Sequence, residues 1–230
     1  MRFGLPSGLV RRAAGRPPPP AAAGTSAARL VAYETCLQRL PGWSHPSWLA
    51  AIGLTPPVAH HPSLAAALGV ELLPADVFDQ PANGLALLAP AALCRVLRAR
   101  ALLRRRPALR RCVEPRLRQK VDEWLHPAVF DAVLLESPDD GLHGDVDGLP
   151  WPPGATPADT PDALAWEGFC LFRQDATWTD APVLRLIRLG FAADAVAPPL
   201  LQERPGAAGG SRWVLDRLNR FVPEVPWLCG

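Results

Sequence analysis

The sequence is almost without lysine, since Lys120 is the single lysine among 24 basic residues. It has no CxxC pair, and its five cysteines are an odd number. Disulfide-stapled secreted folds usually have an even number of cysteines, and cysteine-based zinc sites usually contain CxxC pairs, so the pattern indicates free thiols in a reducing compartment. P-loops, GxGxxG turns, GxSxG elbows and HExxH motifs are absent as well. We therefore expect a non-catalytic protein that uses no cofactor.

Long uninterrupted apolar segments are also missing. Residues 1–27 lack the apolar stretch of a signal peptide. The uncharged stretch from Leu40 to Val70 contains five prolines, which prevent one helix from spanning a bilayer. We therefore expect a cytoplasmic protein with no membrane span.

Metal ligands are sparse in the sequence. Asp145 and Asp147 are spaced like the start of a calcium loop, but the bidentate Glu at the twelfth position is missing. His60 and His61 have no Cys or carboxylate near them, whereas a zinc site needs three or four ligands. We predict no metal site.

The composition is typical of a globular protein, with 49% hydrophobic and 20% charged residues. Leu30, Tyr33, Leu37 and Leu40 recur at helical spacing, which predicts a helix that begins near Thr25. Because alternating apolar and polar runs are few, we expect a mainly α fold with Pro-rich loops. The expected regions are a disordered arm over residues 1–27, a basic helical region over 28–136, an acidic Gly/Pro loop over 137–160 and a smaller helical region over 161–230 that packs on the first.

Charge is distributed unevenly along the chain. Residues 1–120 hold 17 basic and 5 acidic side chains, whereas residues 121–230 hold 7 and 17. Such halves can pair with each other inside the fold or can meet different partners.

The basic residues concentrate between Arg95 and Lys120. On a helix, Arg95, Arg98 and Arg105 lie opposite the apolar face, where solvent is expected. Arg100 and Arg104 point toward the apolar side, and they must snorkel to solvent or find carboxylates, because an unpaired buried charge is costly. The acidic second half could supply these carboxylates.

Three kinds of partner could meet this arginine cluster, namely nucleic acid, anionic lipid and an acidic protein surface. No aromatic residue lies between Arg95 and Lys120, so a platform for base stacking is missing there. We retain a nucleic-acid-binding regulator that uses residues 95–120 as the alternative function.

Two segments resemble a known protein family. Residues 41–54 read PGWSHPSWLAAIGL, and residues 84–113 contain Gly84–Leu88, Leu93–Arg95 and Arg110–Val113. They resemble the K component of the type III secretion sorting platform, most closely its Hrp branch in plant-associated bacteria.

The resemblance implies a virulence-related adaptor at the cytosolic face of the bacterial inner membrane. In that family the K protein links the cytosolic domain of the inner-membrane ring protein (the D component) to the pod protein (the Q component). The pods connect through the L component to the export ATPase. We predict partner contacts, but no nucleic-acid contacts, for these residues: Arg95, Arg98, Arg105, Arg106, Arg110, Arg111, Trp43, His45, Trp48 and Trp227.

Overall fold

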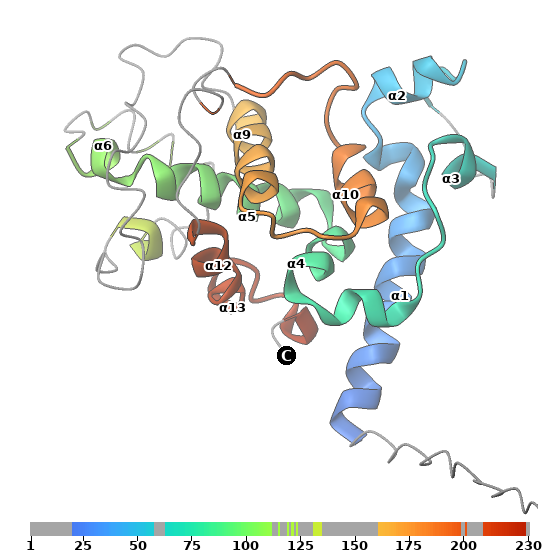
Figure 1. Ribbon diagram of the computed structural model, residues 1–230, viewed down its shortest axis with the longest axis horizontal. Coiled ribbons are helices and arrows are strands. Elements are labelled where there is room, and N and C mark those ends of the chain that lie inside the picture. Colours follow the sequence, from blue (N-terminus) through green and yellow to red (C-terminus); the bar gives the residue numbers. More distant parts are fainter. Residues whose placement is uncertain are drawn as a thin grey trace, which may run out of the picture.

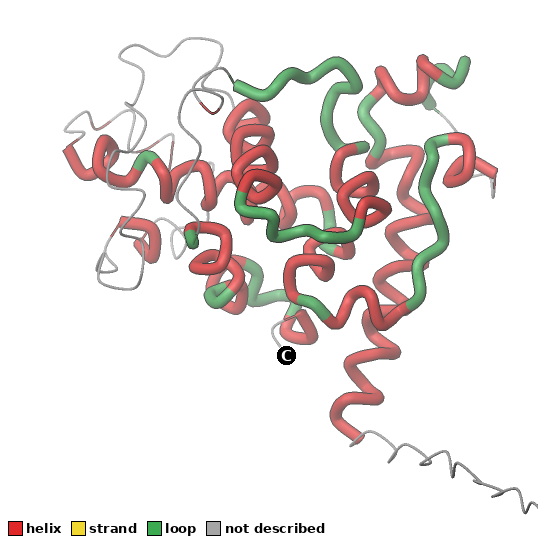
Figure 2. Tube along the Cα trace, in the orientation of Figure 1, coloured by secondary structure: helices red, strands yellow, loops and turns green. Residues whose placement is uncertain are grey.

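The computed structural model describes residues 20–57, 63–111, 131–134, 161–198 and 209–228, with single positions at 115, 119, 121, 123 and 201. Every regular element in these ranges is helical and none is a strand, as Figure 2 shows. The predicted mainly α fold is confirmed. No helix in the described ranges is both long enough and apolar enough to cross a membrane.

The first helix, α1 (Pro20–Trp43), has 24 residues and begins earlier than the sequence predicts. Residues 20–27, which we expected in the arm, are helical; proline suits the first turn of a helix, and three alanines follow it. The rest of the predicted arm lies outside the described residues. Figure 1 shows that the N-terminal turns of α1 extend beyond the other helices.

Helix α1 also continues to Trp43, three residues past Leu40, where the apolar repeat that predicts the helix ends. Pro41 lies inside its last turn, where it cannot donate a backbone hydrogen bond. The turn persists because Trp43 is anchored from outside, with its indole Nε1–H donating to the carbonyl of Leu186 at 3.0 Å.

Short elements fill the chain between α1 and the central helix. Proline occupies the first turn of two of them, α2 and α4, where its missing N–H costs nothing. These elements are α2 (Pro46–Ala51), α3 (Ser63–Ala67), η1 (Ala75–Asp79), α4 (Pro81–Gly84) and η2 (Leu85–Leu87).

The central helix is α5 (Pro90–Arg104), and it is buried on most of its circumference. Helix α9 (Pro161–Gln174) crosses it in Figure 1. The two backbones meet at Gly168, where an added Cβ atom would lie 1.8 Å from the carbonyl oxygen of Leu97. Only glycine permits this approach, so the second half of the chain packs directly on the first.

The remaining elements complete one continuous hydrophobic core that runs from Tyr33 to Leu228. The acidic loop predicted over 137–160 lies outside the described residues. These last elements are α6 (Arg106–Arg111), α10 (Ala181–Arg188), α12 (Gly210–Leu215), α13 (Leu218–Phe221) and η4 (Pro226–Leu228).

Candidate interaction site

The Trp-Ser-His-Pro-Ser-Trp segment joins α1 to α2 and holds both against the end of α10. Trp48 Nε1 donates to the carbonyl of Phe191 at 2.7 Å, as Trp43 does to Leu186. The backbone N–H of His45 donates to the carbonyl of Leu189 at 2.8 Å. All three bonds reach carbonyls within residues 186–191, so residues 43–48 tie α1 and α2 to that stretch. We call residues 43–48 the clasp.

Side chains within the clasp also satisfy each other. His45 caps α2, since its Nδ1 accepts from the backbone N–H of Ser47 at 3.2 Å. The hydroxyl of Ser47 accepts the backbone N–H of Ala193 at 2.8 Å. Arg185 stacks over Trp48, with its guanidinium carbon 4.3 Å from the ring centroid. The clasp residues thus have clear roles inside the fold, and partner binding by Trp43, His45 and Trp48 stays a prediction.

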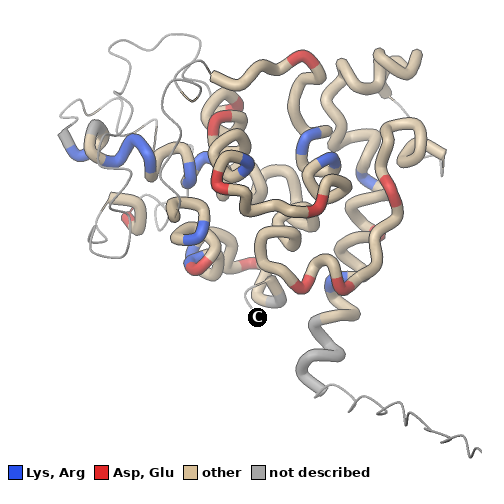
Figure 3. Tube along the Cα trace, in the orientation of Figure 1, with Lys and Arg blue, Asp and Glu red and all other residues tan. Residues whose placement is uncertain are grey.

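Four described arginines of the cluster are engaged inside the chain, and their carboxylate partners come from the second half. Figure 3 shows basic positions of α5 near acidic positions of α9. Arg95 pairs with Glu224 at 2.9 Å, and Arg98 approaches Asp162 at 3.6 Å. Both arginines also donate to backbone carbonyls, Arg95 to Phe221 and Arg98 to Pro161. Internal pairing is therefore one role of the uneven charge distribution.

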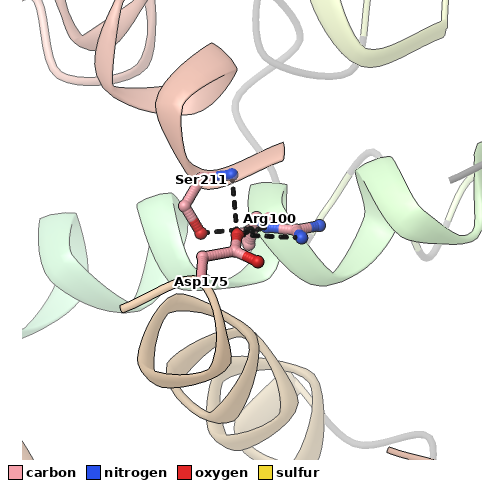
Figure 4. A network of polar contacts seen from close by, with 3 residues as sticks. All are labelled: Arg100, Asp175 and Ser211. Carbon is pink, nitrogen blue, oxygen red and sulfur yellow. Dashed lines mark hydrogen bonds and ion pairs between the residues drawn. The ribbon is translucent and has the colours of Figure 1, made fainter. Parts of the chain in front are cut away.

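Arg100 lies in the deepest of these pairs, drawn in Figure 4. Its Nη2 lies 3.1 Å from Oδ2 of Asp175, and the side chains are 0% and 4% exposed. Ser211 completes the network: its hydroxyl accepts from Arg100 Nε at 3.1 Å, and its backbone N–H donates to Asp175 at 3.1 Å. An added Cβ at Gly210 would lie 2.5 Å from the guanidinium carbon. Of the two possibilities for Arg100, snorkelling or a carboxylate from the second half, the structure shows the second.

Arg95, Arg98 and Arg105 were expected in solvent. The side chains of Arg95 and Arg98 are only 24% and 17% exposed, and for Arg105 the prediction is wrong. The residue is 8% exposed, and its Nε donates to Oε1 of Glu167 at 3.2 Å, with a second bond from Nη2 to Oε2. α5 ends at Arg104, so helical spacing no longer fixes the direction in which Arg105 points. Burial raises the pKa of the Glu167 carboxyl above its ordinary value, and the Arg105 guanidinium opposes that rise.

The other predicted contact residues differ in how far they are exposed to solvent. Arg106 is buried, as is Arg104. Arg110 is exposed and donates to the carbonyl of Leu134 through Nε at 2.9 Å and Nη2 at 2.7 Å. The side chains of Arg111 and Trp227 lie outside the described part of the structure.

Helix α1 leaves two flanks open on either side of its inward stripe. Ala32, Cys36, Arg39 and Trp43 follow one another at helical spacing and form the first flank. Together with Ala86–Pro90, this flank lines an open groove of about 140 Å³, which we call the α1 groove. Both segments that carry the family resemblance thus contribute to one concave surface. The repeat at these four positions is visible in the sequence, but the wall opposite them is not.

The second flank of α1 exposes apolar and acidic side chains. Leu30 on α1 is 46% exposed, and Leu72, in the segment that follows α3, is 81% exposed. The Tyr33 hydroxyl holds Leu72 near α1, because it accepts the N–H of Leu73 at 3.1 Å and donates to the carbonyl of Glu71. Glu34 and Glu71 are both exposed here. We call this surface the acidic flank.

The comparison with protein families assigns this chain to a family. Residues 20–224 match the family described as HrpB4, bacterial type III secretion protein. The chain belongs to the HrpB4 family. Neither the curated proteins nor the solved structures give a significant match to it. The affiliation makes this chain a bacterial type III secretion protein, and it implies partners within the secretion apparatus.

The described thiols of this HrpB4-family chain are poor nucleophiles. Burial raises the pKa of both Cys36 and Cys170 to about 11, and it raises the pKa of Cys94 as well. Among the described residues there is no group of three His, Cys, Asp or Glu side chains that could hold a metal ion. His60, His61, Asp145 and Asp147 lie outside the described residues.

Proposed function

We propose that this HrpB4-family protein is a non-catalytic adaptor that links the cytosolic domain of the inner-membrane ring protein to the pod protein of the sorting platform. It would be held at the cytoplasmic face of the inner membrane through the ring, with an indirect connection through the pods to the L component and the export ATPase. The family affiliation supports a role in secretion, and the resemblance to the K component supports the specific place.

The observation that carries the proposal is the position of α1 between two open surfaces of different chemistry. The α1 groove carries the exposed cation of Arg39 and the aromatic ring of Trp43. The acidic flank carries exposed leucines beside Glu34 and Glu71. A linker between two proteins needs two surfaces that do not compete, and charge of opposite sign steers different partners to each.

A nucleic-acid-binding role has less support. Phosphate binding depends on basic side chains that are free to reach the backbone of the nucleic acid. Arg95 and Arg100 instead pair with Glu224 and Asp175, and Arg105 pairs with Glu167.

The experiment is a three-component binding assay with the full-length chain, the pod protein and the ring protein's cytosolic domain from the same bacterium. We expect each partner to bind the chain alone, and the ternary complex to elute as one species in size-exclusion chromatography with light scattering. Competition between the two partners for the chain would contradict the linker role. Binding of neither partner would overturn the proposed place in the apparatus, and salt-sensitive binding to duplex DNA would favour the alternative.

A further inference from the structure

The α1 groove is concave and mostly apolar, and a single charge lies on its wall. Cys36, Ala32 and Trp43 form one side, and Ala86–Pro90 form the other. Cys36 is tied into the wall, because its thiol donates to the carbonyl of Ala86 at 3.6 Å. With its pKa near 11 the thiol stays neutral at physiological pH, so the wall behaves as apolar surface.

Arg39 supplies that charge. It is exposed, and among the described residues no carboxylate or carbonyl accepts a hydrogen bond from it. This sets it apart from Arg29, Arg95 and Arg98, each of which has a carboxylate partner within the chain. Within the described ranges its guanidinium is not paired with a carboxylate, and its exposure lets a carboxylate of another protein reach it.

The start of α5 adds positive potential at the same place. Ala89 and Pro90 line the groove and begin this 15-residue helix. The helix has no side-chain cap and no acidic residue in its first turn, so its N-terminal partial charge is not compensated locally. The concave groove, an arginine with no carboxylate partner among the described residues and the uncapped start of α5 therefore lie at the same place.

We infer that the α1 groove binds a segment of a partner protein that inserts one large apolar side chain and carries a carboxylate next to it. An apolar cavity of about 150 Å³ holds a benzene ring, and the groove's volume of about 140 Å³ is close to that size. The carboxylate pairs with Arg39, whose guanidinium can donate two parallel hydrogen bonds to it in bidentate geometry. The inference relies on the proposed function only for the choice of binding partners in its test.

The test compares two groove variants with a matched control. Arg39→Glu reverses the exposed charge, and Thr35→Trp fills the groove from its α1 side. Arg212→Glu makes the same charge change on α12, at a side chain that is 83% exposed. Binding to the purified pod protein and to the ring protein's cytosolic domain is measured for each variant by titration calorimetry. Circular dichroism checks that each variant remains helical.

We expect both groove variants to weaken binding to one and the same partner by at least about tenfold, with the other partner and the control unchanged. Raising salt from about 50 to about 300 mM should weaken that interaction in the wild type and much less in Arg39→Glu. If both groove variants bind both partners within about twofold of the wild type, the inference is wrong.

Binding at the α1 groove can still be tested if the proposed function is wrong. When the wild type binds neither partner, the same variants are placed in the native cells and secretion of an effector is measured. Lost secretion in Arg39→Glu and Thr35→Trp, with normal secretion in Arg212→Glu, supports the groove; normal secretion in all three overturns it.

The chemistry of the occupant is read by a photo-crosslinking amino acid placed at position 35 in those cells. We expect the crosslinked peptide to come from another protein of the secretion apparatus and to carry an apolar residue beside Asp or Glu. A basic peptide, a second copy of this chain, or residues 137–160 of the same chain would overturn the inference.

Discussion

Arg100 of α5 and Asp175, directly after α9, form an ion pair that joins the two halves of the chain inside the protein. Because both side chains are almost completely buried, removal of one charge leaves the other unpaired in a medium of low polarity. The pair and Ser211 therefore constrain how α9 and α12 sit on α5.

The first prediction follows from this pair. Asp175→Asn should lower the free energy of unfolding by about 3–5 kcal/mol, since Arg100 keeps its charge and loses its counter-ion. Urea unfolding followed by circular dichroism measures the loss. The control is Asp216→Asn in the exposed pair with Arg212, which should cost no more than about 1 kcal/mol. Equal effects at the two sites would contradict the structural role of the buried pair.

Gly168 provides the second prediction. In Gly168→Ala the new methyl group would collide with the carbonyl of Leu97, and α5 and α9 would have to separate. We expect a loss of about 3 kcal/mol or more in the free energy of unfolding, or failure to fold. Gly42→Ala in α1 meets no atom within 4 Å and should be neutral or slightly stabilising. A stable Gly168→Ala variant with unchanged unfolding would show that the helices do not cross this closely.

Ser47 tests whether the clasp holds the fold together. Ser47→Ala removes the acceptor for the N–H of Ala193 and the hydroxyl that contacts His45. A backbone donor left without a partner costs about 1–3 kcal/mol, so the unfolding midpoint should fall. Partner affinity of the folded variant should stay near the wild-type value, because the Ser47 hydroxyl is engaged inside the chain. Weakened binding without loss of stability would instead assign the clasp to an interface.

The buried thiols predict a loss of stability at alkaline pH. In the unfolded chain Cys36 and Cys170 ionise near their ordinary pKa of 9.0, whereas in the fold their pKa is about 11. Between these values only the unfolded state releases protons, so stability is full below pH 9 and falls as pH rises toward 11. Urea midpoints measured across this window should decline. The double variant Cys36→Ala and Cys170→Ala should show a shallower decline, and an unchanged slope would contradict the assignment.

Local sequence patterns predicted much of the helical content. The repeat of Tyr33, Leu37 and Leu40 predicted α1, and its start was misplaced because the alanines after Pro20 were assigned to the arm. The spacing of Arg100 on α5 correctly predicted a residue that needs a carboxylate, since helical periodicity alone fixes its direction.

The interaction surfaces were predicted less well. Arg105 was expected in solvent because the periodicity was extended past the end of α5, and nothing local indicated that Glu167 would lie beside it. Arg39 was not singled out, since a lone arginine on a helix has no distinctive pattern. Its significance depends on Ala86–Pro90, which lie more than forty residues away.

The sequence by itself therefore determined the helical class, the absence of familiar catalytic motifs, the unequal charge of the two halves and the segments that resemble a secretion family. Periodicity and composition act over a few residues and need no knowledge of neighbours in space. Only the tertiary structure decided which charged side chains form ion pairs within the described chain and which are exposed at its surface. Ion pairs such as Arg100 with Asp175 join residues 75 positions apart, and the packing of α9 on α5 selects them. The same packing leaves Arg39 at the edge of a groove, where no carboxylate of the described chain reaches it.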